Sequence, residues 1–436
     1  MNANMQVRSL STQNIIDLIE KYGTPLYVYD EKLLRAKCRA VLAIPSAFGL
    51  YVGYAMKANS SRALLEIIAS ENIGIDASSF NEVQRAIAAN IKAQRIMLTT
   101  QDIPMGDDRK ELECLMKEGL LYNVCSQQQL ELIADFVQKE KLPISVRVNP
   151  GIGTGESVTR NTGDDYSSFG NHLGNIENLL AIVRERKIVV KQVHCHIGSG
   201  GDPQVWRANI ERMLEITERY FPEAKWVNLG GGFKEARMPD ESAADINELG
   251  IYAKQQFEAF AARTGRQLTM VVEPGTFLIA NAGYVVAVVI DKKTTGQNGF
   301  EFLILDAGME TITRPLLYGS RHPFYVVSRD GCLLSSEFDP QVSSNNKLVV
   351  AGRCCESGDS QTLDAQGHIA PRAMANPNIG DYVIIGGAGA YCSSMSLVGY
   401  NSYTQAAEVL VREDGSLQLI RKRQTLLQLC QNELPL

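Results

Sequence analysis

Residues 49–57 read Gly-Leu-Tyr-Val-Gly-Tyr-Ala-Met-Lys, a mostly apolar run that is followed by a segment of helical period at Ser61–Glu71. Seven more apolar or β-branched runs follow up to residue 273, with a helical segment between each pair. This alternation is typical of a parallel α/β domain. The eight expected strands are Gly49–Lys57, Gly74–Ser78, Arg95–Thr99, Tyr122–Cys125, Ile144–Asn149, Val189–His196, Trp226–Gly230 and Leu268–Glu273. They favour a closed (β/α)8 TIM barrel, with a doubly wound sheet as the alternative.

The pattern changes after about residue 280, where strand-like runs are separated by turns. These runs are Tyr284–Asp291, Phe302–Asp306, Phe324–Val327, Lys347–Ala351, Tyr382–Ile385, Ala407–Val411 and Leu417–Ile420. They predict a mostly β domain with a short helix at its end. We therefore expect an N-terminal segment at 1–40 that packs partly with the β domain, a barrel at 41–280, and a β-sandwich or barrel-like domain at 281–436.

Composition and charge exclude several classes of protein. The 436 residues are 45% hydrophobic and 21% charged, with a net charge of -6, and they contain no long basic block and no apolar run near the ~20 residues of a membrane span. We therefore expect a small-molecule substrate, no nucleic-acid or membrane partner and, since the N-terminus does not resemble a signal peptide, a cytoplasmic location. The nine cysteines include no C-x-x-C pair, which predicts reduced thiols and no metal site.

Unusual polar residues fall at the carboxyl ends of the predicted strands. Lys57 ends the first, His196 the sixth and Glu273 the eighth, while Gly230–Gly232 follow the seventh. In a parallel barrel these ends meet at one rim, where active sites form. Each residue alone has a simpler explanation: a solvated lysine, a core histidine, a flexible turn or a plain Glu-Pro-Gly turn. Their joint placement on one rim is the stronger indication.

Physical chemistry gives each rim position a possible role. A partly desolvated Lys57 would suit a Schiff base with an aldehyde, because desolvation lowers a lysine pKa. Three consecutive glycines would let backbone N–H groups approach a phosphate, with the Ser199 hydroxyl as a further donor. Glu273 could keep a pyridinium nitrogen protonated, and His196 could lie flat against the ring.

Two motifs of the β domain could also carry chemistry. Arg353–Asp359 reads Arg-Cys-Cys-Glu-Ser-Gly-Asp, and a thiol among carboxylates should have a raised pKa that suits a proton donor. Two buried structural cysteines are the simpler interpretation. Arg314 and Tyr318 could hold a carboxylate, although an Arg-Pro turn with a core tyrosine is equally plausible.

With these segments assembled, the sequence resembles the alanine-racemase-like (fold type III) pyridoxal-phosphate decarboxylases, and within them the diaminopimelate decarboxylase family. The resemblance extends over most of the chain. Its motifs are Pro25-Leu-Tyr-Val-Tyr-Asp30, Tyr54-Ala-Met-Lys57, Arg147-Val-Asn-Pro150, His194-Cys-His-Ile-Gly-Ser199, Gly230-Gly-Gly232, Glu273-Pro-Gly275, Asp306-Ala-Gly-Met309, Arg314-Pro-Leu-Leu-Tyr318, Cys355-Glu-Ser-Gly-Asp359, Gly389-Ala-Tyr391 and Arg421-Lys-Arg-Gln-Thr425.

The resemblance implies a cofactor, pyridoxal 5′-phosphate, and a set of residues that bind it. Lys57 is implied as the Schiff-base lysine, with Asp76 near it, and His196 as the residue that stacks on the cofactor. Glu273 is implied at the pyridine nitrogen. The residues implied at the phosphate are Ser199, Gly230, Gly231, Gly232, Gly275 and Tyr391.

The same resemblance implies how substrate and subunits are arranged. Arg314, Tyr318 and Glu356 would face the substrate, and Cys355, supplied by the other subunit, would donate the proton. A head-to-tail homodimer with two shared active sites follows from that arrangement. The implied activity is decarboxylation of meso-2,6-diaminopimelate to L-lysine and CO2 in lysine biosynthesis.

The chain departs from the family pattern at four places, and these keep other functions open. Thr276 stands where the family usually has an arginine after Glu-Pro-Gly, so a cation that binds phosphate or substrate carboxylate is missing. Gly387 replaces an aspartate, Ser167-Ser168-Phe169-Gly170 lacks a lysine, and Asn401–Glu408 is altered. A paralogue that decarboxylates another amino acid or conjugate, in a siderophore, antibiotic or D-amino acid pathway, is the main alternative. A non-catalytic cofactor-binding or regulatory relative and a racemase are further alternatives.

Overall fold

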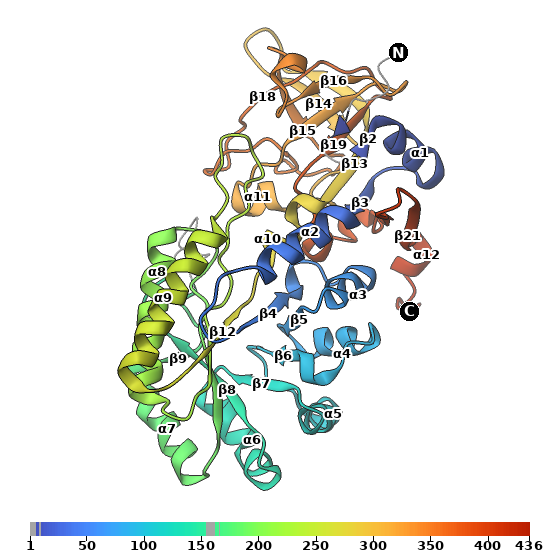
Figure 1. The fold of residues 1–436 in the computed structure, drawn as a ribbon. Helices are drawn as coiled ribbons and strands as arrows, with labels where there is room; N and C mark the ends of the chain where they lie inside the picture. Colours follow the sequence, from blue (N-terminus) through green and yellow to red (C-terminus); the bar gives the residue numbers. More distant parts are fainter. Residues whose placement is uncertain (1–5, 8–9, 154–161, 165) are drawn as a thin grey trace. The chain divides into compact units, whose positions relative to one another are not determined.

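The structure, a computed structural model, describes residues 6–7, 10–153, 162–164 and 166–436 (Figure 1). The chain divides into two compact units. The barrel unit comprises Arg35–Lys234 and Ala243–Leu278, and the β unit comprises Met1–Leu34, Glu235–Ser242 and Ile279–Leu436. Within the described residues, no helix has the length and apolar character needed to cross a membrane.

Eight parallel strands close into a barrel. Each strand pairs with its neighbours in parallel, and the ring closes where β12 pairs with β4, with Met270 opposite Leu50. The strands are β4 (Leu50–Ala55), β5 (Gly74–Ala77), β6 (Ile96–Leu98), β7 (Leu121–Val124), β8 (Ile144–Asn149), β10 (Val190–His194), β11 (Trp226–Asn228) and β12 (Thr269–Val272). All eight predicted strands and the TIM barrel are confirmed. A doubly wound sheet is excluded because its edge strands would stay unpaired.

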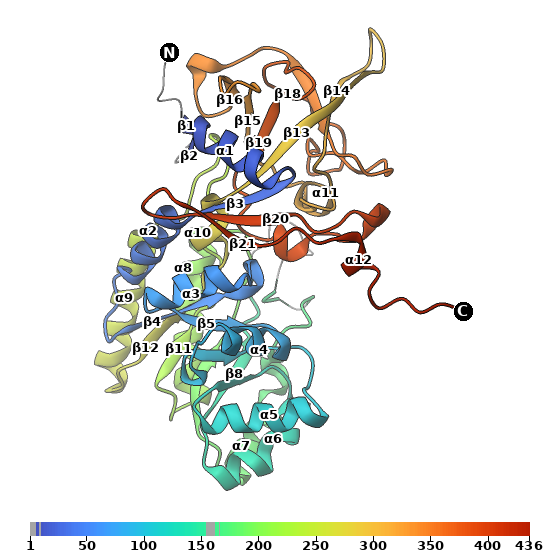
Figure 2. The same ribbon diagram turned by 90° about the vertical axis from the view of Figure 1, so that its right-hand side faces the viewer.

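Helices follow the strands and cover the outside of the barrel (Figure 2). They are α3 (Arg62–Ser70), α4 (Phe80–Ala88), α5 (Gly106–Lys117), α6 (Gln127–Glu140), α7 (Ile176–Glu185), α8 (Pro203–Tyr220) and α9 (Ile246–Thr264), and all seven were predicted. Ser79, Ser126 and Asp202 cap three of them by accepting a backbone N–H of the first turn. The sequence did not predict α2 (Glu31–Leu42), which precedes β4.

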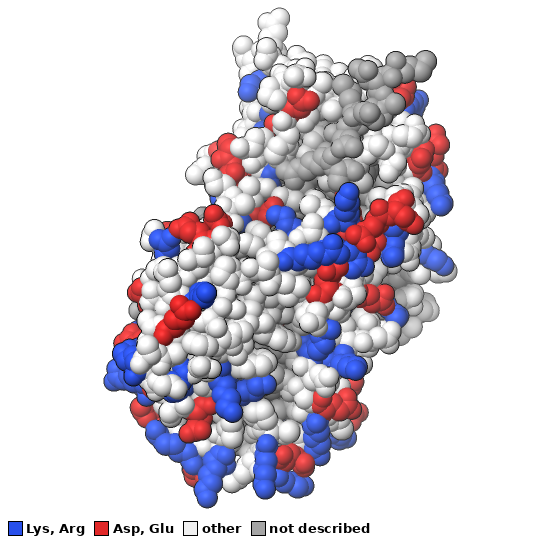
Figure 3. Space-filling model, in the orientation of Figure 1, with Lys and Arg blue, Asp and Glu red and all other residues white. Residues whose placement is uncertain are grey.

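The surface charges of the barrel helices are mixed. Arg62 pairs with Glu66 at 2.8 Å and Arg109 with Glu113 at 2.7 Å, each across one helical turn. Basic and acidic side chains lie interspersed on the face that Figure 3 shows. Arg109 and Glu113 are half-buried, whereas Arg62 and Glu66 are exposed. An exposed helical pair adds only about 0.3–0.5 kcal/mol, so it serves solubility more than stability.

The β unit is built on one ten-stranded sheet in which the long strand β13 pairs with β14, β19 and β3. All seven predicted strands are present: β13 (Gly283–Thr294), β14 (Glu301–Leu305), β15 (Phe324–Val327), β17 (Lys347–Ala351), β19 (Tyr382–Ile385), β20 (Ala407–Val411) and β21 (Leu417–Arg421). The sequence did not predict β3 (Leu26–Asp30), β16 (Leu333–Ser336) or β18 (Arg372–Ala373). The expected final helix is α12 (Leu426–Leu429).

The N-terminal segment supplies part of the core of the β unit. All five residues of β3 are buried, and the strand pairs antiparallel with β13 and parallel with β20. Leu10, Ile15 and Leu18, from β2 (Leu10–Ser11) and α1 (Thr12–Tyr22), join the same apolar cluster. Burial of such side chains contributes about 1.5–3 kcal/mol each, so this segment stabilises the β unit.

Two backbone segments nearly touch where β13 begins. A Cβ added at Gly283 would lie 2.2 Å from Gly389 Cα, and one added at Gly389 would lie 1.9 Å from Ile279 O. Gly389 N also donates to Ala280 O at 2.9 Å. Only glycine fits at these two positions, so the first residue of the Gly-Ala-Tyr motif has a structural reason.

Candidate active site

Three strand ends of the barrel bring the predicted rim residues to one edge of the barrel unit. Lys57 follows β4, His196 follows β10 and Glu273 follows β12. The rim segments are joined by a hydrogen bond from Ala55 N to Pro274 O at 3.2 Å. Because all eight strands are parallel, their carboxyl ends share this rim, as predicted.

Lys57 lies beyond the end of its strand. Strand β4 stops at Ala55, and the chain turns through a 3-10 helix, Met56–Ala58, in which Met56 and Ala58 are buried and Lys57 is exposed. This exposure is contrary to the expectation of a partly desolvated lysine. Its charge nevertheless acts on Asp76 and Glu273, whose carboxyl pKa values it lowers.

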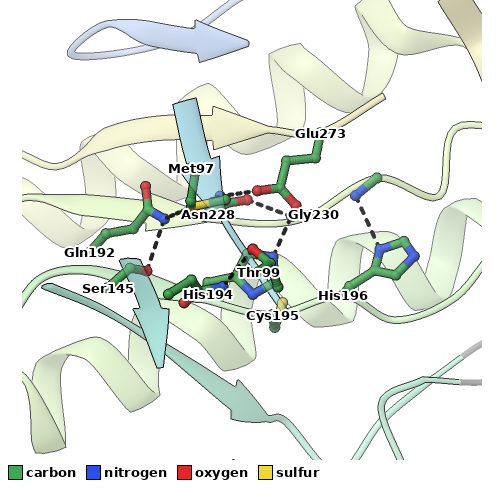
Figure 4. A network of polar contacts seen from close by, with 12 residues as sticks. Met97, Thr99, Ser145, Gln192, His194, Cys195, His196, Asn228, Gly230 and Glu273 are labelled. Carbon is green, nitrogen blue, oxygen red and sulfur yellow. Dashed lines mark hydrogen bonds and ion pairs between the residues drawn. The ribbon is translucent and has the colours of Figure 1, made fainter. Parts of the chain in front are cut away.

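Glu273 is the centre of a buried polar network that joins three strand ends (Figure 4). His194 Nε2 lies 2.9 Å from Glu273 Oε2, and Asn228 Nδ2 donates to Glu273 Oε1 at 2.6 Å. Asn228 Oδ1 in turn accepts from Gly230 N at 2.9 Å. The side chains of His194, Asn228 and Glu273 point toward one another, so the carboxyl is held in one orientation.

His194 and Asn228 were not predicted as site residues. His194 is two residues before His196, and alternate residues of a strand point to the same side. Asn228 is two residues before Gly230 in the same way. The two-residue spacing from His196 and Gly230 was the sequence signal that could have identified His194 and Asn228.

Burial controls the protonation of this network. It lowers the pKa of His194 well below its usual value, and the charge of Arg147 lowers it further, so His194 is neutral and its Nε2 shares one hydrogen bond with Glu273 Oε2. Burial raises the pKa of Glu273 to about 7, against the opposing effect of the Asn228 hydrogen bond. Burial and the nearby Glu273 raise the pKa of Asp76 to about 8. Oδ1 of Asp76 has no hydrogen-bond partner among the described residues.

The triple glycine is required by close packing. Gly230 has a φ of +69°, and a Cβ there would lie 2.5 Å from Cys195 O. A Cβ at Gly231 would lie 2.5 Å from Glu273 O. The backbone of this turn therefore lies directly against the neighbouring strand ends.

The backbone N–H groups of this turn are only partly available for the expected phosphate site. Gly230 N donates to Asn228 and Gly231 N donates to His196 Nδ1 at 3.2 Å, so two of the three amides are already used. Of the three, only Gly232 N has no acceptor among the described residues. Ser199 is half-buried, and its hydroxyl can add a second donor.

The segment after Glu273 runs close to the Lys57 turn. A Cβ at Gly275 would lie 3.3 Å from Ala58 Cβ, so the two segments are in contact. Thr276 begins the short helix α10 (Thr276–Ile279) and is half-buried. No cation stands at this position, as the sequence indicated.

In the β unit, Arg314 lies against two of the predicted tyrosines. Arg314 begins the short helix α11 (Arg314–Tyr318) and is 4% exposed. Its Cζ lies 5.7 Å from the centre of the Tyr318 ring and 5.9 Å from that of Tyr391. Its Nη2 donates to Ser320 Oγ at 3.1 Å. Three residues of two predicted motifs are thus brought together.

The two neighbouring cysteines of the Arg353–Asp359 turn differ in environment. Cys354 is buried and its thiol donates to Glu310 at 3.2 Å, and burial with the Glu310 charge raises its pKa strongly. Cys355 is exposed, and its backbone N–H donates to Asn401 Oδ1 at 2.7 Å. The expected thiol among carboxylates is therefore Cys354, and the expectation of two buried cysteines is wrong for Cys355. Glu356 is exposed and accepts from the Tyr400 hydroxyl at 3.1 Å.

Glu310, Cys354 and Asp359 form a compact buried cluster that would have the ligand types of a metal site. Its hydrogen bonds are already made within the β unit. Arg353 Nε pairs with Glu310 at 3.1 Å, and Asp359 accepts the backbone N–H groups of Met309 and Cys354, each at 2.7 Å. These contacts explain the cluster: it stabilises the turn that carries Cys355.

The raised pKa values of Asp76 and Glu273 predict how stability depends on pH. Because the folded-state pKa values lie above the ordinary ones, the folded state loses stability as pH rises through about 7 and about 8. Between pH 5.5 and 8.5, urea unfolding of the ligand-free wild type should show a free energy of unfolding that falls by about 3 kcal/mol more than that of Asp76→Asn. An equal fall in both proteins would contradict the assigned shifts.

Comparison with known proteins agrees with this geometry. The family described as "Pyridoxal-dependent decarboxylase, pyridoxal binding domain" matches residues 33–280. Diaminopimelate decarboxylase of Streptomyces coelicolor is 31% identical over 95% of this chain and 90% of its own. That of Methanothermobacter thermautotrophicus is 33% identical over 94% and 91%. A crystal structure of a diaminopimelate decarboxylase covers 96% of each chain with a TM-score of 0.86 and 28% identity.

The match of the family to the barrel and the near full-length similarity of the curated relatives point to one family. The barrel with its lysine and carboxyl on one rim and the mostly β unit are the fold and the residue pattern that the sequence predicted. The chain therefore belongs to the pyridoxal-dependent decarboxylases and, within them, to the diaminopimelate decarboxylase family.

Proposed function

We propose that the protein decarboxylates meso-2,6-diaminopimelate to L-lysine and CO2 with pyridoxal 5′-phosphate as cofactor. The observation that carries this proposal is the rim of the barrel unit, where Lys57 and the buried Glu273 follow strands that pair in the closed ring. The full-length similarity to diaminopimelate decarboxylases supports the choice of substrate. Lysine biosynthesis is the pathway that this reaction serves.

The residues of the rim fit the cofactor. The exposed amine of Lys57 can bond to the cofactor aldehyde, and the fixed carboxyl of Glu273 can hold a ring nitrogen. Asp76 Oδ1 is a buried acceptor without a partner among the described residues, which is consistent with a ligand nearby. We assign the phosphate to Gly232 N, Ser199 and Gly275, with Gly230 and Gly231 as the packed turn that presents them, and we include Tyr391 from the β unit.

When bound, the cofactor takes up the electron pair that is left when CO2 departs. The protein's residues orient the reactants and control protons. Glu273 keeps the ring nitrogen protonated, because its own orientation is fixed by His194 and Asn228. His196 Nδ1 accepts a hydrogen bond from Gly231 N. In the proposed site, the face of the His196 ring stacks on the cofactor.

Residues of the β unit complete the assignment. We propose that Arg314, Tyr318 and Glu356 bind the substrate and that Cys355 returns the proton to Cα from the partner subunit of a homodimer. Exposure of the Cys355 thiol supports a role that needs access, whereas buried Cys354 does not have that access. As a substrate contact, Thr276 offers a hydroxyl group and no charge. A cytoplasmic location stays a prediction.

A paralogue with another substrate is the second candidate function. Thr276 and Gly387 favour it, since both positions depart from the family pattern near ligand-binding motifs. A non-catalytic relative is disfavoured because the chain keeps both Lys57 and Cys355.

Release of CO2 tests the substrate. The cofactor-loaded protein is assayed with meso-diaminopimelate and, separately, with D-lysine, D-ornithine, L-ornithine and L-arginine. We expect release from meso-diaminopimelate alone. Release from another amino acid in its place, by a protein that still binds the cofactor, would contradict diaminopimelate as substrate and support the paralogue.

Mixing two inactive variants tests the shared active site. Lys57→Ala and Cys355→Ala should each have little activity, and dissociated subunits of the two should reassociate at random. Half of the dimers are then mixed, and one of their two sites has both native residues, so activity should recover to about one quarter of the wild type. The control is a mixture of Lys57→Ala with Cys332→Ala, since Cys332 is an exposed cysteine outside the motif. Cys355 is native in both subunits of these mixed dimers, so the control shows the activity that reassociation gives when only Lys57 is impaired. No recovery for the first pair would contradict a Cys355 supplied by the partner.

A further inference from the structure

A cavity of about 150 Å3 lies inside the barrel unit, and we call it the barrel cavity. Most of its lining residues stand in the amino-terminal halves of the strands, among them Tyr51 in β4, Ile96 in β6, Leu121 in β7 and Trp226 in β11. In a parallel barrel these ends lie opposite the rim that carries Lys57. The barrel cavity is therefore reached from the end of the barrel that faces away from the rim.

An aromatic pair and a lysine form the mouth of the barrel cavity. Tyr51 and Trp226 are half-buried, and their ring centres lie 5.4 Å apart. Lys191 Nζ lies over the Trp226 ring, 3.9 Å from its centre. Burial lowers the pKa of Lys191, and no carboxylate of the described residues pairs with it, whereas Lys117 at the same mouth pairs with Glu140 at 3.2 Å. Lys191 can therefore receive a carboxylate from a ligand.

Two buried carboxyls line the inner end of the barrel cavity. Asp76 is 5% exposed and Glu273 is 6% exposed. Both oxygens of Glu273 have partners in His194 and Asn228, whereas Oδ1 of Asp76 has none among the described residues. Burial raises the pKa of both carboxyls, and the charge of Glu273 raises that of Asp76 further. A positive charge would stabilise two acids that repel each other, and Asp76 Oδ1 can accept a hydrogen bond from it.

Apolar side chains separate the mouth from these carboxyls. They are Ile75, Ile96, Met116, Leu120, Leu121 and Val271. The amide of Gln192 also lines the cavity, but its Nε2 already donates to Met97 S and Ser145 Oγ, each at 3.0 Å (Figure 4). An apolar cavity of this volume can hold a molecule of the size of benzene. The walls therefore suit a short hydrocarbon chain.

The depth of the barrel cavity sets the length of that chain. Trp226 begins β11 at the mouth, and Asn228, which bonds to Glu273, ends the same strand. Two residues of a strand rise about 7 Å. An extended chain advances about 1.2 Å per bond, so about six bonds separate a group at the mouth from a group at the carboxyls.

We propose that the barrel cavity is a ligand site, separate from the rim, that binds an ω-amino carboxylate with its carboxylate at Lys191 and its ammonium at Asp76. The opposite charges at the two ends fix the orientation of the ligand. The aromatic pair and the apolar walls contact its chain. The site does not depend on which amino acid the enzyme decarboxylates.

Three probes of equal chain length test the two ends of the site. Calorimetry on the cofactor-loaded protein compares 6-aminohexanoate with hexanoate, which lacks the amine, and with hexylamine, which lacks the carboxylate. The Kd of 6-aminohexanoate should be lower than either of the others on the order of 10–100-fold, the range for one charged hydrogen bond. A Kd for 6-aminohexanoate that is above roughly 10 mM, or equal to that of hexanoate, would contradict the proposal.

Variants at the two ends should weaken different probes. Lys191→Gln should raise the Kd of 6-aminohexanoate and hexanoate about tenfold or more, and that of hexylamine less than about threefold. Asp76→Asn should do the same for 6-aminohexanoate and hexylamine and spare hexanoate. Lys225→Gln is the control, because Lys225 is exposed beside Trp226, does not line the barrel cavity, and donates its backbone N–H to Lys191 O at 2.9 Å. Equal weakening of 6-aminohexanoate by Lys191→Gln and Lys225→Gln would overturn the proposal.

Filling the barrel cavity separates this site from the rim, where amines can also react with the cofactor aldehyde. Leu121→Phe adds bulk to the wall and should raise the Kd of 6-aminohexanoate about tenfold or more. Leu132→Phe makes the same change at an exposed position of α6 outside the cavity and should leave the Kd unchanged. Urea unfolding checks that both variants are folded. If folded Leu121→Phe binds 6-aminohexanoate as tightly as the wild type does, the probe binds elsewhere and the proposal is wrong.

Discussion

The hydrogen bonds that fix the Glu273 carboxyl are the interaction on which the site depends. His194 and Asn228, at the ends of β10 and β11, hold a carboxyl that follows β12 and is 6% exposed. A buried carboxyl without such partners would be costly and would turn to another acceptor or donor. Three adjacent strands must therefore end in register, and the closed barrel provides that register. The network links the fold directly to the chemistry at the rim.

The barrel could be predicted from the sequence because its signals are local. Each strand is an apolar run, and the helices between the strands have their own period, so all eight strands were found. Strand β3 and helix α2 were missed for a different reason. β3 is defined by pairing with β13 and β20, more than 250 residues away in the chain, and no local pattern reports that. The same holds for Glu235–Ser242, which leaves the barrel sequence to join the β unit.

The site was predicted in its residue types but less well in its environments. Lys57 and Glu273 were placed on the right strand ends, yet Lys57 is exposed because a 3-10 turn follows β4. Two glycine amides are used by Asn228 and His196, which sequence alone cannot show. The burial of Cys354 and exposure of Cys355 depend on the turn geometry.

Nitrogen-15 NMR of the protein loaded with ring-labelled cofactor tests the central claim most directly, that the fixed Glu273 carboxyl holds the pyridine nitrogen in its protonated form. Near pH 7.5 the account predicts a protonated ring nitrogen in the wild type and an unprotonated one in Glu273→Gln, with His194 and Asn228 unchanged in both. An unprotonated nitrogen in the wild type, or the same protonation in both proteins, would contradict it.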